Sequence, residues 1–157
     1  MNAVDTALSR PYLTIVLAGE ACALDVASVV EVVEHAPITR VPRTPDWALG
    51  VLNLRGAIVP VVDLARKLGL APTEVTAKSC VVMVERGEGD ERRVVGILAD
   101  GVDTVVDVDP ASIQSCPSFG SRIPSAYVSG LAPASSRLVP LLDVGRALGA
   151  PDRPVVS

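Results

Sequence analysis

Residue types that often carry out chemistry are few and scattered in this chain. His35 is the only histidine, and it follows Glu34 in a polar stretch. Cys22, Cys80 and Cys116 are far apart and lack C-x-x-C spacing, so we expect three reduced, mostly buried thiols. No nucleophile–base pair, phosphate-binding glycine loop or metal-ligand spacing can be assembled. The sequence therefore predicts no catalytic residue, no metal site and no cofactor.

Four aspartates lie around one valine-rich segment. Of all the acidic residues in the sequence, this group most resembles a cation site. Their spacing does not fit an EF-hand loop. We interpret them as turn residues and a solvated face: Asp100, Asp103, Asp107 and Asp109.

Composition narrows the class of partner. The net charge is −4, with 14 Lys and Arg against 18 Asp and Glu, so neither nucleic-acid binding nor direct membrane insertion is expected. The alternative of a small-ligand or nucleic-acid binding β-barrel is disfavoured by the single Trp, two Tyr and single Phe. The first ten residues carry Asp5 and no apolar run, which predicts a cytoplasmic protein without a signal peptide.

Short apolar runs separated by glycine, proline and charge predict an all-β fold. Valine-rich runs favour strands because β-branched side chains pack well on a pleated surface. The expected strands are 13–17, 21–24, 29–33, 49–54, 57–62, 79–85, 93–98, 102–106, 126–131 and 138–142. Residues 88–91 would form an exposed hairpin tip, and 63–69 and 143–149 would form short helices capped by aspartate.

An internal repeat relates the two short helices and the strands before them. A shift of 80 residues aligns glycine, proline and aspartate as well as apolar positions, which predicts two similar subdomains. The matched pairs are Gly50 and Gly130, Val59 and Val139, Pro60 and Pro140, Asp63 and Asp143, Arg66 and Arg146, Leu68 and Leu148, and Gly69 and Gly149.

The most informative stretch is 51–64, which predicts a hairpin with its turn at Arg55 and Gly56. Pro60 lies within an apolar strand and indicates an edge or a bulge. Arg55 stands among apolar residues, so its guanidinium must reach water or a carboxylate.

This stretch resembles the signature of CheW-like chemotaxis coupling proteins. The family pattern has a V-x-E-[VI] segment, a proline-containing stretch, and then G-[VI]-x-N-L-R-G-x-[VI]-[VI]-P-[VI]-[VI]-D-L. These parts are matched by Val29–Val32, Val41–Pro45 and Gly50–Leu64, and a looser Leu-Leu-Asp-Val follows at 141–144. The resemblance covers residues 12–149.

The resemblance implies a fold of two five-stranded SH3-like barrels with short helices, packed around a shared core. We expect an N-terminal tail at 1–11, the domain at 12–149 and a C-terminal tail at 150–157. The domain would consist of two intertwined barrel subdomains, one rich in residues 27–70 and the other in residues 79–142. The family is not catalytic: it couples methyl-accepting chemoreceptors, transmembrane or soluble, to a CheA-type histidine kinase, and other CheW-like proteins are further partners.

Site residues carry over by position in the motif. The resemblance implies a receptor- or kinase-binding groove that includes Val29, Gly50, Asn53, Leu54, Arg55 and Gly56. It also implies a structural salt bridge between Glu31 and Arg55, at or near the groove between the barrels. We expect this pair to be buried, so that loss of Arg55 would disturb the fold as well as binding.

The second repeat departs from the pattern at its hairpin, where Ala132-Pro-Ala-Ser-Ser136 replaces Leu52-Asn-Leu-Arg-Gly56. Pro133 has no N–H to donate, so we expect the strand ending near Leu131 to be short. The sequence thus suggests a divergent member with weakened kinase or array contact at its second subdomain.

Overall fold

Short β-strands dominate the computed structural model, as the sequence predicts. The structure describes residues 9–34, 37–87, 92–115, 123–134 and 137–149, so His35, Cys116 and the predicted tip at 88–91 lie outside it. The strands are β1 (Arg10–Leu17), β2 (Glu20–Asp25), β3 (Val29–Glu34), β4 (Ile38–Thr39), β5 (Ala48–Leu54), β6 (Ala57–Val62), β7 (Cys80–Arg86), β8 (Arg93–Ala99), β9 (Gly101–Val108), β10 (Val128–Ala134) and β11 (Arg137–Leu142). All ten predicted strands are found, and the two-residue β4 was missed.

Helical segments are short. They are α2 (Leu64–Lys67), α3 (Val144–Leu148) and the 3-10 turns η1 (Val26–Ser28), η3 (Pro110–Ser112) and η4 (Ser125–Tyr127). Within the described residues, no helix has the length and apolar character needed to cross a bilayer.

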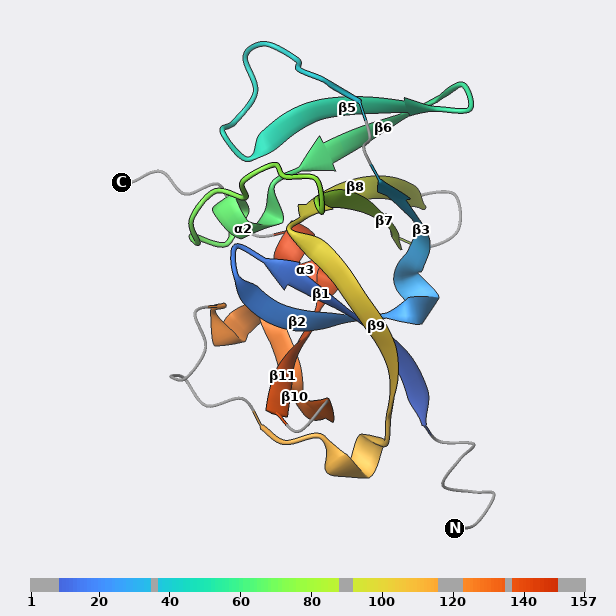
Figure 1. The fold of residues 1–157 in the computed structure, drawn as a ribbon, viewed down its shortest axis with the longest axis vertical. Helices are drawn as coiled ribbons and strands as arrows, with labels where there is room; N and C mark the ends of the chain where they lie inside the picture. Colours follow the sequence, from blue (N-terminus) through green and yellow to red (C-terminus); the bar gives the residue numbers. More distant parts are fainter. Residues whose placement is uncertain (1–8, 35–36, 88–91, 116–122, 135–136, 150–157) are drawn as a thin grey trace.

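The strands form two sheets, one above the other in Figure 1. The five-stranded sheet has the order β10-β11-β2-β1-β9, and the six-stranded sheet has the order β3-β7-β8-β6-β5-β4. Strands β7 and β8 thus lie with β3–β6, whereas the sequence analysis grouped residues 79–142 together. The reason is long-range pairing: β7 pairs with β3, and β8 pairs in parallel with β6.

Three apolar clusters fill this arrangement. The largest takes side chains from both sheets and both helices, including Ile15, Leu24, Val82, Ile97 and Leu148, and forms a shared core between the sheets. A smaller cluster around Ala132, Val139 and Leu141 belongs to the five-stranded sheet. Another, around Leu52, Val61 and Met83, belongs to the six-stranded sheet. Two barrel interiors and a common core result, which confirms the predicted all-β fold of two subdomains.

The repeat is also present in three dimensions. The carboxylate of Asp63 accepts a hydrogen bond from the Arg66 amide and caps α2, and Asp143 does the same for the Arg146 amide at α3. Each helix follows a strand that pairs in parallel with a strand of a neighbouring hairpin. These parallel pairs are β6 with β8 and β11 with β2. The matched Asp residues therefore mark equivalent strand-to-helix turns.

Pro60 and Pro133 both lie within paired strands. Strand β6 is flanked by β5 and β8, so the expectation that Pro60 lies on an edge strand is wrong. Pro60 pairs with Val51 of β5, and the parallel pairing of β6 with β8 begins one residue later, at Val61. Pro133 does not shorten its strand: β10 continues to Ala134, so that expectation is wrong. Strand β10 is the outermost strand of its sheet, and Leu131 makes a bridge to Gln114 on its outer side. A missing N–H at Pro133 is tolerated in such an outer strand.

Candidate functional site

The turn between β5 and β6 presents the charged residue singled out by the sequence. Arg55 and Gly56 both have positive φ, 51° and 85°, as expected for a two-residue type I′ hairpin turn. The side-chain oxygen of Asn53 accepts a hydrogen bond from the Gly56 amide at 3.2 Å. The three residues are exposed, and local hydrogen bonding holds Arg55 at the apex of the hairpin.

Arg55 makes an ion pair with Glu31 of β3. Its Nη2 donates to Oε1 of Glu31 at 2.7 Å. The Arg55 hydrogen bond lowers the pKa of the Glu31 carboxyl, and the same contact raises the pKa of Arg55. Both residues belong to elements of the six-stranded sheet, and β3 and the β5–β6 hairpin are not adjacent strands. The pair therefore connects the hairpin turn to a distant strand of the same sheet.

The expected burial of this pair is wrong. The Arg55 side chain is 71% exposed and that of Glu31 is 33% exposed. The apolar residues next to Arg55 in sequence point elsewhere because strand side chains alternate between the two faces, and a turn apex projects beyond the packed strands. An exposed pair contributes little to stability, so the charges are available to a partner.

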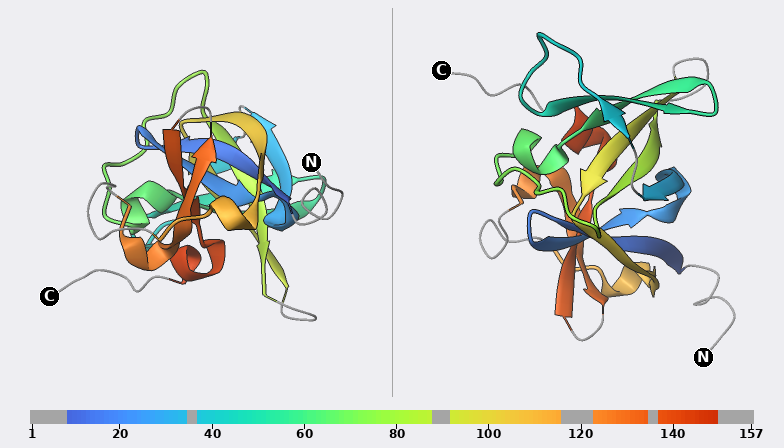
Figure 2. Two further views of the ribbon diagram at one scale, coloured as in Figure 1. Left: turned by 90° about the horizontal axis from the view of Figure 1, so that it is seen from below. Right: turned by 45° about the horizontal axis from the view of Figure 1, so that its top comes forward.

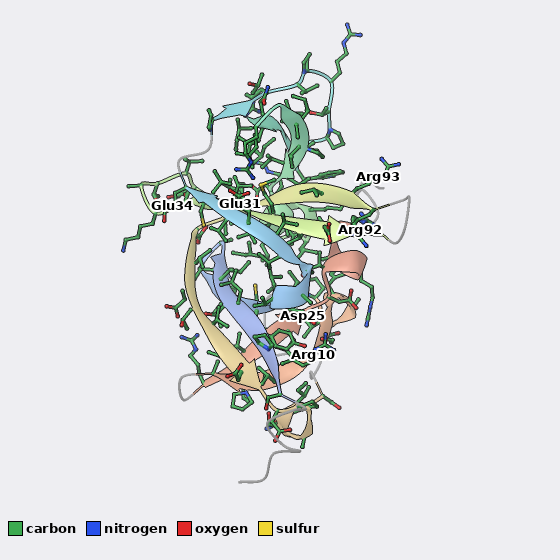
Figure 3. All side chains as sticks on the ribbon, turned by 90° about the vertical axis from the view of Figure 1, so that its right-hand side faces the viewer. Arg10, Asp25, Glu31, Glu34, Arg92 and Arg93 are labelled. Atoms are coloured by element: carbon green, nitrogen blue, oxygen red, sulfur yellow. The ribbon has the colours of Figure 1, made fainter. Side chains whose placement is uncertain are left out.

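Strand β3 also exposes apolar side chains, on the face opposite to that of Glu31. It lies at the edge of its sheet, and among the described strands it pairs with β7 alone. Val30 and Val32 are 49% and 37% exposed and lie on one face of the strand, followed by exposed Glu34. Figure 3 shows Glu31 and Glu34 on β3, with the separate Arg10–Asp25 ion pair below them.

The other predicted groove residues differ in position. Val29 is half-buried and packs against the shared core, and Leu54 is half-buried against the cluster of the six-stranded sheet. Gly50 is buried at the opposite end of β5, where a Cβ would lie 2.0 Å from the carbonyl oxygen of Thr39. Gly50 thus permits the close approach of β4 and is not part of the exposed surface.

Sequence reasoning missed Val30 and Val32. The run Val-Val-Glu-Val-Val-Glu has valine on both faces of the strand, so alternation alone does not show which valines face outward. Pairing of Glu31 with Arg55 is the signal that could have oriented the strand. Charged and apolar groups side by side on an edge strand suit protein binding.

Comparison with known proteins gives a consistent result. The family model for the CheW-like domain matches residues 11–151. The chain is 30% identical over 150 residues to "Chemotaxis protein CheW" of Klebsiella aerogenes, covering 96% of this chain and 88% of that protein. It is 33% identical over 132 residues to "Chemotaxis protein CheW" of Thermotoga maritima, covering 82% of this chain and 81% of the relative.

A solved structure is also similar. The crystal structure of the scaffolding protein TtCheW from Thermoanaerobacter tengcongensis matches with a TM-score of 0.77 and 30% identity. The match covers 88% of this chain and 87% of that chain. The similarity therefore extends over both sheets and is not confined to the 50–64 motif.

Proposed function

The chain belongs to the CheW-like domain family, and we propose that it couples a methyl-accepting chemoreceptor to a CheA-type histidine kinase as a chemotaxis-type signalling adaptor. The relatives are chemotaxis proteins and a scaffolding protein by name, which supports binding as the activity. We place the domain at residues 12–149 and the protein in the cytoplasm.

The observation that carries the receptor-binding role is the exposed Arg55–Glu31 ion pair at the turn of the β5–β6 hairpin. A chemoreceptor tip is a helical hairpin, and a helix presents apolar anchors at i, i+3 and i+4 with charges between them. Arg55 offers a guanidinium that can donate two parallel hydrogen bonds to a carboxylate. Val30 and Val32 offer apolar contact on the other face of β3. Asn53 and Gly56 fix the position of Arg55.

The kinase would bind at the end of the five-stranded barrel, away from Arg55, because the equivalent end of the six-stranded barrel is the hairpin that carries Arg55. Leu138 of β11 is 46% exposed and corresponds in the repeat to Ile58 of β6, which is 61% exposed. Two such ends would allow the chain to alternate with a related barrel or with other CheW-like proteins. Each contact would be small, and an array would supply strength through multivalency. The altered second hairpin, with Pro133 and Ala134, would weaken the contact at that end.

The experiment is a binding assay with the cytoplasmic signalling domain of a receptor and the CheA-type kinase of the same organism. Wild-type chain is expected to bind both, and Arg55→Ala is expected to lose receptor binding while it keeps kinase binding. Arg10→Ala is the matched control, since Arg10 also makes an exposed ion pair, with Asp25 at 3.0 Å. Wild-type chain that binds neither protein would refute the adaptor function. Equal losses in the two variants would refute the assigned receptor surface.

A further inference from the structure

A second surface lies at the opposite end of the β5–β6 hairpin from Arg55. It is an open groove of about 840 Å³ beneath the loop of residues 40–47. Strand β5 has seven residues, so the groove and the Arg55 turn are separated by about 20 Å. Figures 1 and 2 show this loop and the hairpin turn at opposite ends of the pair of strands.

The walls of the groove are apolar and partly exposed. Val41 is 41% exposed and Val75 is 76% exposed, although both are large aliphatic side chains. Leu49 and Ile38 are half-buried and also line the groove. An aliphatic side chain of a ligand would remove this apolar surface from water, which is favourable at about 25 cal/mol per Å².

The charges of the groove are incompletely paired. Asp63 is buried and accepts hydrogen bonds from the Thr73 amide and hydroxyl, both at 3.0 Å. Arg66 lies 3.6 Å from Asp46. These contacts occupy both aspartates of the lining.

Arg40 and Arg43 remain on the rim. Both are exposed, and among the described residues neither makes an ion pair or hydrogen bond. In a chain of net charge −4, this local excess of positive charge indicates a negatively charged ligand.

The loop that carries these arginines is held in a defined shape. The Thr44 hydroxyl donates to the carbonyl oxygen of Val41 at 3.0 Å, and the Ala48 amide donates to that of Pro45 at 2.9 Å. Arg43 has φ of 64°, in the left-handed region that non-glycine residues rarely adopt.

Three prolines in the lining restrict the kind of anion that fits. Pro42, Pro45 and Pro72 have no N–H, so the backbone contributes few of the donors that make a phosphate-binding cradle. Recognition must come from guanidinium groups, whose planar fork matches a carboxylate as well as a phosphate. The apolar walls require an aliphatic group beside that carboxylate.

We propose that this groove binds an acidic segment of a partner protein, in which carboxylates flank a large aliphatic side chain. The carboxylates pair with Arg40 and Arg43, and the aliphatic side chain packs between Val41 and Val75. The site is separate from the Arg55 surface and does not depend on receptor coupling.

The test is a titration of the full-length ¹⁵N-labelled chain with the peptide acetyl-Gly-Glu-Leu-Glu-Gly-amide, followed by amide NMR spectra. Saturable shifts are expected around residues 38–49 and 72–75, with an affinity that falls as NaCl rises from about 50 to 500 mM. Arg40→Gln combined with Arg43→Gln is expected to weaken binding at least about tenfold. Arg92→Gln combined with Arg93→Gln is the matched control, an exposed arginine pair on another hairpin, and should bind like wild type.

Two further probes separate the alternatives. The peptide with both Glu residues replaced by Gln should bind at least about tenfold more weakly, and sodium phosphate alone should not reproduce the shifts. The proposal would be overturned if the Gln peptide bound as tightly as the Glu peptide, or if phosphate produced the same shifts. It would also be overturned if the two double variants lost the same affinity, or if no saturable shifts appeared near the groove. The Arg40 and Arg43 double variant should still bind receptor, so failure here is distinguishable from failure of the adaptor function.

Discussion

Asp63 and Asp143 make the same pair of backbone contacts in the two halves of the chain. The Asp63 amide donates to the carbonyl oxygen of Trp47 at 2.7 Å, and the Asp143 amide donates to that of Tyr127 at 2.8 Å. Each carboxylate then caps the helix that follows. The two differ in burial, since Asp63 is 2% exposed and the Asp143 side chain is 33% exposed. The repeat thus preserves the turn but not its environment.

This difference predicts unequal effects of the same substitution. Asp63→Ala removes a cap and leaves the buried amide and hydroxyl of Thr73 without acceptors, which should cost about 3 kcal/mol of unfolding free energy. Asp143→Ala removes a cap at a more exposed position and should cost about 1 kcal/mol. Urea unfolding at pH 7 measures both. Equal losses of unfolding free energy in the two variants would mean that the hydrogen bonds of Thr73 to Asp63 contribute nothing to stability.

Gly50 and Gly69 allow a second matched comparison. Both have positive φ, 149° and 88°, but a Cβ at Gly50 would collide with the Thr39 backbone, whereas nothing lies within 4 Å at Gly69. Gly50→Ala should therefore cost about 3 kcal/mol or more, because strain and a backbone clash combine. Gly69→Ala should cost about 1 kcal/mol from strain alone. Denaturant unfolding is the measurement, and a mild Gly50→Ala variant would contradict the close approach of β4.

The sequence predicted local elements better than their assembly. Strand 57–62 was predicted with the bounds that β6 has, because Gly56 and Asp63 mark both of its ends. Intertwined subdomains were expected from the family resemblance, but the strand pairing that connects them was not predicted, since the pairing of β1 with β9 joins residues about ninety positions apart and leaves no local pattern. The partners Glu31 and Arg55 were named from the motif, but their exposure depends on where the turn projects, which no residue spacing encodes.

Cys22 provides a pH-dependent prediction. Burial, with a smaller contribution from Glu20, raises the pKa of this thiol to about 12 from an ordinary value of 9.0. Between these two pH values the unfolded chain binds fewer protons than the folded chain, so stability falls as pH rises above about 9. The melting temperature should decline between pH 8 and pH 10.5 more steeply in wild type than in Cys22→Ala. If the melting temperatures of wild type and Cys22→Ala declined in parallel, the assigned burial of the Cys22 thiol would be contradicted.

The same thiol should be chemically protected. A variant with Cys80→Ala and Cys116→Ala leaves Cys22 as its single cysteine. At pH 8 a thiol with a pKa of about 12 has a thiolate fraction about 10³-fold lower than one with a pKa of 9.0, so reaction with Ellman's reagent should be slower by about that factor in the folded chain than in 6 M guanidinium. Rapid labelling of the folded variant would refute the prediction.

Charge reversal at the exposed ion pair separates direct receptor contact from a structural role of Arg55. Because the Arg55 side chain is 71% exposed, its guanidinium has free donors beyond the one bonded to Glu31. Arg55→Glu alone places two carboxylates together and should abolish receptor binding. Adding Glu31→Arg restores an ion pair of the opposite polarity, so the hairpin turn can again be held against β3. We expect the melting temperature of the double variant to lie between those of wild type and Arg10→Ala. The double variant should still fail to bind the receptor domain. Recovery of binding would show instead that Arg55 acts by positioning the turn, and that Val30 and Val32 make the decisive contacts.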